Sequence, residues 1–231
     1  MTTTITYDFQ FDAGRRETVT VAFNPETLRL DPPAADDLPD WTALDFHRCA
    51  NCPLAEAGAD RCPLAVQLVG IARRLGQVPS YEKLTLHVRT EARIVSARTT
   101  AQTALGSLMG LIMPLSGCPR LAPLAPMARF HLPLSTHEET IYRVMSMYLL
   151  SRFFRDDAAP PADDGLSGLS DIYANIQQVN QGLSARMRNS NEFIEVNSVA
   201  LLDLYAQTMP FVIEASLDDI RHLFEPEREV A

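Results

Sequence analysis

The sequence predicts an α+β fold, with a small antiparallel sheet of two N-terminal hairpins packed on helices and a mainly helical C-terminal part. Apolar and polar residues alternate in Ile5–Phe11 and again in Val19–Phe23, with a turn at residues 12–15 between them. The alternation returns in Leu84–Val88 and at Ile94 and Val95. Because a lone hairpin is marginally stable in water, we expect the two hairpins to pair into one sheet.

Helical periodicity accounts for most of the remaining chain. Five prolines between residues 114 and 134 lead us to expect no regular structure there. The pattern Ser135-Thr136-His137-Glu138 is typical of a capping box and opens a helix. Its expected core face carries Ile141, Val144, Met145, Tyr148 and Leu149. The predicted helices span residues 63–75 with Gly76 as the stop, 100–113, 136–154, 169–187, 192–215 with a break near Pro210, and 217–224.

The chain divides at a stretch rich in Asp, Ala, Pro and Gly. We expect an α+β part over residues 1–155, a linker or loop over 156–168, and a helical part over 169–231. The resemblance given below implies that the helical part packs on the same core as the α+β part.

Composition limits the classes of function. The chain has 231 residues, 46% hydrophobic content and a net charge of −9, which fits a soluble globular protein and argues against broad nucleic-acid binding. No apolar run reaches the roughly 18 residues of a membrane span, and the first residues lack the features of a signal peptide. We therefore expect a cytoplasmic protein without membrane association.

Four cysteines carry most of the functional information. Cys49, Cys52 and Cys62 follow the spacing C-x2-C-x9-C, and Cys118 comes 55 residues after the last of them. Because disulfides are disfavoured in the cytoplasm, clustered cysteines there are better read as metal ligands or redox thiols. The spacing predicts one site that joins two distant parts of the fold.

Proline directly follows Cys52, Cys62 and Cys118. Since proline is favoured at the first helical position, each of these cysteines is expected at a helix N-cap. There, unpaired backbone N–H groups and the helix dipole lower the pKa of a thiol and favour the thiolate that binds metals.

Several occupants fit this pattern. An iron–sulfur cluster held by Cys49, Cys52, Cys62 and Cys118 is the first, because clusters take four thiolates and proline often follows a ligand cysteine. Zinc held by the same four residues is an alternative, although its usual signature has two close cysteine pairs. Zinc held by His47, Cys49, Cys52 and Cys62 is another. The cysteines could also be metal-free thiols or small apolar core residues.

Two other groups of residues have weaker support as functional sites. His131, His137, Glu138 and Glu139 suggest a second site, but acidic residues also suit the first turn of a helix. Cys118 with His131 would make a nucleophile–base pair, for which no third member is identifiable. Glycine-rich phosphate loops and hydrolase or metalloprotease motifs are absent.

Three segments carry a resemblance to a known family: Phe46–Leu54 around Cys49 and Cys52, Leu111–Pro119 with the Ser-Gly-Cys-Pro element, and Pro126–Pro133. They resemble a bacterial family known only as a domain of unknown function, and the likeness extends over nearly the whole chain. The resemblance implies one shared architecture and conserved positions for the four cysteines. It implies no activity.

Two functional hypotheses follow. The first is a non-enzymatic protein in which the cysteine site is a redox-sensing or structural cofactor site and an unknown protein is the partner. The second is an enzyme that uses a cluster for electron transfer or Cys118 as a nucleophile. The lack of a catalytic signature favours the first.

Overall fold

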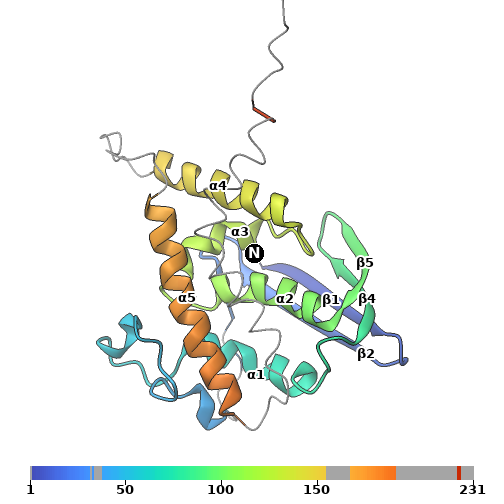
Figure 1. Ribbon diagram of the computed structural model, residues 1–231, viewed down its shortest axis with the longest axis horizontal. Helices are drawn as coiled ribbons and strands as arrows, with labels where there is room; N and C mark the ends of the chain where they lie inside the picture. Colours follow the sequence, from blue (N-terminus) through green and yellow to red (C-terminus); the bar gives the residue numbers. More distant parts are fainter. Residues whose placement is uncertain (1, 32, 34–37, 155–166, 191–222, 225–231) are drawn as a thin grey trace, which may run out of the picture.

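A five-stranded antiparallel sheet forms one layer of the computed structural model, which describes residues 2–31, 33, 38–154, 167–190, 223 and 224 (Figure 1). The strand order is β3-β2-β1-β4-β5. Strand β1 lies at the centre and pairs with β2 and β4, so the two predicted hairpins form one sheet. The strands are β1 Thr3–Phe11, β2 Arg16–Asn24, β3 Arg29–Leu30, β4 Lys83–Arg89 and β5 Ile94–Thr100.

One face of this sheet is buried. Along β1 the apolar side chains of Ile5, Tyr7, Phe9 and Phe11 are almost completely inaccessible, whereas the residues between them are partly or fully exposed. Because successive side chains of a strand point to opposite faces, this alternation puts one apolar row against the helices. The Tyr7 hydroxyl reaches the backbone carbonyl of Ser107 in α2, which fixes the helix against the sheet.

The helices cover that face and extend beyond it (Figure 1). The predicted 63–75 helix is confirmed at both ends, with Gly76 at the C-cap. The helices are α1 Pro63–Leu75, α2 Ala101–Leu115, α3 Ala125–Arg129, α4 His137–Phe154 and α5 Ser167–Arg188, with short 3-10 helices η2 Asp40–Thr42, η3 Pro53–Ala55 and η4 Ala122–Leu124.

The proline-rich stretch 114–134 holds more regular structure than expected. Helix α2 continues through Pro114 to Leu115, and η4 and α3 follow. Pro123 and Pro126 lie in the first turns of η4 and α3, where the missing N–H has no intrahelical partner to lose. The expectation of no regular structure was therefore wrong, because these prolines start short helices.

Helix α4 begins with a capping box shifted by one residue from the predicted one. The Thr136 hydroxyl accepts the backbone N–H of Glu139 at 3.2 Å, and the Glu139 carboxylate accepts the backbone N–H of Thr136 at 2.7 Å. Leu149, expected in the core, is 54% exposed, whereas Met147 is buried.

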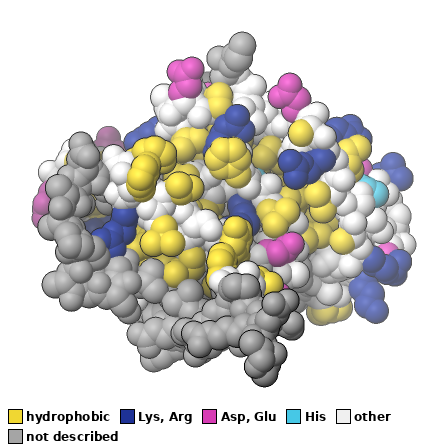
Figure 2. Space-filling model, turned by 90° about the horizontal axis from the view of Figure 1, so that it is seen from above, with side chains coloured by type: hydrophobic (Ala, Val, Ile, Leu, Met, Phe, Trp, Pro, Cys, Tyr) yellow, Lys and Arg dark blue, Asp and Glu magenta, His cyan; other side chains and the backbone are white. Residues whose placement is uncertain are grey.

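The outer face of α4 carries large apolar side chains. Figure 2 looks down on the end of the molecule with α4 and shows hydrophobic side chains spread over this face. The exposed apolar residues of α4 are Tyr142, Leu149, Leu150, Phe153 and Phe154. Exposed apolar residues gathered on one element are typical of a contact surface.

Helix α5 belongs to the same core as the sheet. Its apolar stripe, which includes Leu169, Tyr173 and Leu183, joins one hydrophobic cluster with β1, α1 and α2. The expected helices 192–215 and 217–224 lie outside the described residues, apart from a turn at 223–224. The expected linker also lies outside them, except for its last two residues, which begin α5. No helix in the described part of the chain is long and apolar enough to cross a membrane.

Candidate metal centre

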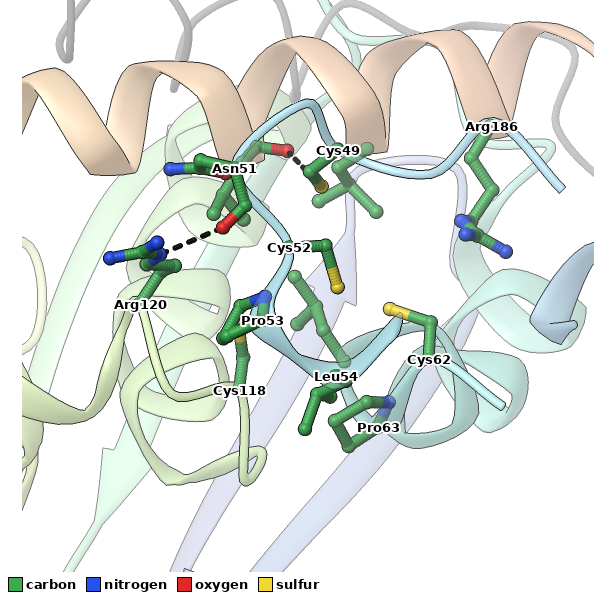
Figure 3. A pocket seen from close by; sticks show the side chains of 13 residues that line it. Cys49, Asn51, Cys52, Pro53, Leu54, Cys62, Pro63, Cys118, Arg120 and Arg186 are labelled. Atoms are coloured by element: carbon green, nitrogen blue, oxygen red, sulfur yellow. Dashed lines mark hydrogen bonds between the residues drawn. The ribbon is translucent and has the colours of Figure 1, made fainter. Parts of the chain in front are cut away.

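The four cysteines line one cavity. Cys49, Cys52, Cys62 and Cys118 all border it, together with two arginines and apolar residues of α5 (Figure 3). The cavity lies where the 49–62 loop, the start of α1, the turn after α2 and the face of α5 meet. Cys52 and Cys62 turn their sulfur atoms toward each other across it (Figure 3). Segments that are distant in sequence thus bring all four thiols to one place.

Two of the Cys-Pro pairs open helices, as expected. Cys52 is the N-cap of η3 and Cys62 is the N-cap of α1, each with proline at the start of the helix. Neither side chain caps its own helix with a hydrogen bond, so both thiols are free to face the cavity. The backbone N–H of Cys62 donates to the Thr42 carbonyl at 2.9 Å, which anchors the start of α1 to the chain after η2.

Cys118 is placed by a tight turn instead of a helix. Gly117, directly before it, has a φ of +89°, a conformation that glycine adopts without steric strain. The chain then turns, and the backbone N–H groups of Leu121 and Ala122 both donate to the Cys118 carbonyl at 3.1 Å. The N-cap expectation for Cys118 is therefore corrected, because η4 begins only at Ala122.

Helix α5 closes the cavity at very short range. A Cβ atom added to Gly182 would lie 2.6 Å from the Cys49 sulfur and 3.1 Å from its Cα. The Cys49 thiol also points at the Val179 carbonyl, with 3.9 Å between sulfur and oxygen. Only a residue without a side chain allows this approach, so Gly182 fixes how α5 meets the cysteine loop.

Hydrogen bonds of Asn51 fix the position of the loop between Cys49 and Cys52. The Asn51 side-chain amide donates to the backbone carbonyl of Asn175 at 3.1 Å and to its side-chain oxygen at 2.9 Å. The backbone carbonyl of Asn51 accepts a hydrogen bond from Arg120 Nε at 2.8 Å (Figure 3). Asn51 therefore joins the loop between Cys49 and Cys52 both to α5 and to the turn that carries Cys118.

Arg186 supplies a buried positive charge beside the thiols. It is only 2% exposed, and its guanidinium donates to the carbonyls of Trp41, Ala43 at 2.6 Å and Leu44 at 3.2 Å. None of the acidic side chains among the described residues forms an ion pair with it. Burial lowers the pKa of Arg186, and the charges of Cys62, Cys49 and Cys52 oppose this shift. A buried cation needs compensating negative charge, which these cysteines would supply as thiolates.

Two of the thiols, those of Cys49 and Cys118, resist ionisation. Burial, with the neighbouring cysteines in support, raises the pKa of Cys49 to about 12. Burial also raises the pKa of Cys118, although the backbone N–H groups of Arg120 and Leu121 oppose the shift. The expectation of a lowered pKa for Cys118 was therefore wrong, because desolvation outweighs these donors.

The donor set suits a soft metal or cluster. The free volume of the cavity is about 20 Å³, roughly the space of one water-sized sphere. No group of three or more His, Cys, Asp or Glu among the described residues stands close enough together to hold a metal ion. Four thiols with backbone N–H donors and a buried cation nearby nevertheless fit thiolate ligation chemically.

The other residues singled out from the sequence lie elsewhere. His47 is exposed, packs edge-on against the Phe46 ring and does not line the cavity. His137, Glu138 and Glu139 are exposed in the first turn of α4. His131 hydrogen-bonds the Tyr7 hydroxyl and lines a different cavity from Cys118, so the structure does not bring these two together as a nucleophile–base pair.

Sequence reasoning missed the residues that frame the cysteines. Asn51, Arg120, Gly182 and Arg186 are common residue types without a motif of their own. The detectable signals were positional, since Asn51 lies between two cysteines and Arg120 follows Cys118-Pro119. Gly182 and Arg186 lie one helical turn apart, but nothing in the sequence ties that face to a loop 130 residues earlier.

Comparison with known proteins gives a family and no activity. The family model described as a domain of unknown function (DUF6901) matches residues 5–225, which is nearly the whole chain. No curated protein and no solved structure matches the chain. The match covers the sheet, the cysteine cavity and α5, so these form one family unit.

Proposed function

The chain belongs to the family described as a domain of unknown function (DUF6901), and for it we propose a metal centre held by Cys49, Cys52, Cys62 and Cys118. An iron–sulfur cluster is the first assignment and zinc is the alternative. The observation that carries the proposal is that all four cysteines line one cavity, although Cys118 comes from a different part of the chain. Chance burial of four separate core cysteines would not gather them.

Charge supports a bound centre. A cluster or ion with four thiolates carries net negative charge, and two arginines, Arg120 and Arg186, line the same cavity. Without a centre, Arg186 is a buried cation beside a neutral Cys49 thiol, because burial raises the pKa of Cys49. A metal removes the desolvation penalty of the thiolates, and the arginines then compensate the charge of the complex.

The choice of an iron–sulfur cluster as the first assignment rests on the residue pattern. Clusters take four thiolates, and proline often follows a ligand cysteine. The usual zinc signature instead has two close cysteine pairs.

The role that fits this centre is that of a cytoplasmic, non-enzymatic redox sensor or protein-interaction module. The cavity is small and closed by α5, which leaves little space for a substrate beside the cysteines. The exposed apolar residues of α4, among them Phe153 and Phe154, supply a surface suited to a protein partner. Use of Cys118 as a nucleophile has less support, because burial raises the pKa of its thiol.

The test is the metal and sulfide content of full-length protein purified without oxygen. We expect iron and acid-labile sulfide with a broad visible absorption band, which zinc would not give. Cys118→Ser should lose the centre, whereas His47→Ala serves as the matched control and should retain it. Circular dichroism of each variant separates the loss of a ligand from the loss of the fold.

Two results would contradict the proposal. The first is protein without stoichiometric iron or zinc after expression in medium supplied with both. The second is full metal content in Cys118→Ser together with loss in His47→Ala, which would assign the fourth ligand to His47.

A further inference from the structure

A second cavity lies on the same helix α5, away from the cysteines. Its volume is about 260 Å³, and α2, the chain between α3 and α4, α4 and α5 enclose it. This is close to the size of pockets that hold small ligands. The cavity goes beyond the proposed metal centre, because none of its lining residues is a cysteine.

Glycines in α2 make room for it. Gly106 and Gly110 both line the cavity, one helical turn apart. A Cβ atom added to Gly110 would meet nothing within 4 Å, so no neighbouring group requires glycine there for close packing. Glycine weakens a helix interior by about 0.5–1 kcal/mol relative to alanine, so Gly110 leaves this space open at a cost to the stability of α2.

The lining is largely apolar. Side chains of Met113, Leu121, Met127, Leu132 and Ile176 form much of the wall. This surface suits a hydrocarbon body. An apolar occupant would remove this surface from water and so contribute stability.

One positive charge faces this apolar wall. Arg143 of α4 is the sole charged side chain among the described lining residues. Its Nη2 donates to the carbonyls of Met127 and Phe130, both at 2.9 Å, which holds the guanidinium in place at the rim. The Glu139 carboxylate on the same helix accepts the backbone N–H of Thr136. Its charge also acts on Arg143, whose pKa is lowered by burial and raised by Glu139.

The other polar side chains among the described residues that line the cavity are neutral hydrogen-bonding groups. His131 bonds the Tyr7 hydroxyl, and the Ser107 hydroxyl lies 3.2 Å from the same oxygen. Burial, together with the charge of Arg143, lowers the pKa of His131 to about 4, so the imidazole is neutral at physiological pH. The cavity therefore offers one cation and several neutral hydrogen-bonding groups.

We propose that this cavity binds a small amphipathic carboxylate, with its hydrocarbon body against the apolar wall between α2 and α5 and its carboxylate on Arg143. An arginine guanidinium forms strong, charge-assisted hydrogen bonds with carboxylates. The apolar wall selects a hydrocarbon body, and the positive charge of Arg143 selects a carboxylate head group.

Calorimetric titration of the full-length protein with octanoate, and separately with 1-octanol, tests this site. We expect saturable one-to-one binding of octanoate. Arg143→Gln should weaken octanoate binding roughly tenfold or more, as the loss of a charged hydrogen bond implies, and leave octanol binding unchanged. Gly110→Leu should fill the cavity and abolish the binding of both probes.

Gly70→Leu is the matched control for the filling variant. Gly70 lies in helix α1 with nothing within 4 Å of its added Cβ and does not line this cavity, so binding should persist. No saturable octanoate binding, or binding that survives Gly110→Leu with the helical content intact, would overturn the proposal. The second result would assign the binding to the exposed apolar face of α4.

Discussion

The two cavities along α5 differ in what their glycines do. At the cysteine cavity, a Cβ on Gly182 would lie 2.6 Å from the sulfur of Cys49, whereas at the second cavity a Cβ on Gly110 would meet nothing. The first glycine brings a helix into contact with a loop, and the second keeps a space open. The same residue type thus allows close packing at the cysteine cavity and leaves open space at the second cavity.

The cavities also differ in charge. The cysteine cavity has two arginines beside four ionisable thiols, which suits a bound centre of net negative charge. The second cavity has Arg143 beside a neutral histidine, which suits a single anionic head group. Each difference can be tested by substitutions that should act on one cavity and spare the other.

The largest effect is expected from Arg186→Met. This change leaves the carbonyls of Trp41, Ala43 and Leu44 without their donor and removes the positive charge beside the thiols. We expect the free energy of unfolding to fall by about 3–5 kcal/mol and metal content to fall with it. Urea denaturation under nitrogen measures the change.

Arg188→Met is the control for that substitution. Arg188 is exposed near the end of the same helix, so its loss should change stability by less than about 0.5 kcal/mol. Equal effects of the two substitutions would show that Arg186 has no special role at the cysteine cavity.

The next largest effect is a pH dependence of the free energy of unfolding, caused by His131 in the second cavity. The pKa of His131 is lowered to about 4 in the folded protein, against about 6.5 in the unfolded chain. Between these values the unfolded chain binds more protons, so the stability present above pH 6.5 is lost as the pH falls toward 4. The loss should reach about 1–3 kcal/mol.

Burial and the Arg143 charge cause this shift, while Tyr7 supplies the hydrogen-bonding partner. His131→Gln should therefore flatten the profile of unfolding free energy between pH 6.5 and 4. A wild-type profile that stays level over this range, or one that His131→Gln leaves unaltered, would contradict the assignment. His137→Gln, at an exposed histidine of α4, should leave the profile as it is.

Gly182→Ala should destabilise the protein, contrary to the usual effect of alanine in a helix. The added methyl group overlaps Cys49, and overpacking of this kind costs about 1–3 kcal/mol, which exceeds the helix gain of about 0.5–1 kcal/mol. We expect a net loss of stability and a lower metal content. A rise in stability at full metal content would mean that α5 does not approach Cys49 this closely.

Gly110→Ala gives the smallest expected effect, and its sign is opposite. Because the methyl group enters open space, the helix gain of about 0.5–1 kcal/mol is retained. The thermal unfolding midpoint should rise by a few degrees for a chain of this size. A decrease would show that this part of α2 is packed against another group.

The sheet and α1 were predictable because their signals are local. Alternation along β1 and the apolar stripe of α1 each follow from the periodicity of one segment. The structure of the 114–134 stretch was not predictable in the same way, because proline occurs both inside a helix and in the first turn of a new one. Pro114 lies inside α2, whereas Pro126 lies in the first turn of α3.

The spacing of the cysteines and the prolines that follow them predict one shared site. All four cysteines line one cavity, but no group of them among the described residues stands close enough to hold a metal ion, so the shared metal site stays a prediction. The residues that hold the cysteine loop in place were not predictable. Asn51 and Arg186 act through backbone carbonyls of remote segments, and any residue type can provide such an acceptor. Partner choice of this kind is set by the fold, so it leaves no pattern in the sequence.

X-ray absorption spectroscopy of the full-length protein, purified without oxygen, tests the central claim most directly. The account predicts absorption at the iron edge with sulfur alone in the first coordination shell and neighbouring iron atoms beyond it. Zinc with four sulfur ligands would select the alternative occupant of the same site. A first shell with nitrogen or oxygen ligands, or protein that carries neither metal, would contradict the account.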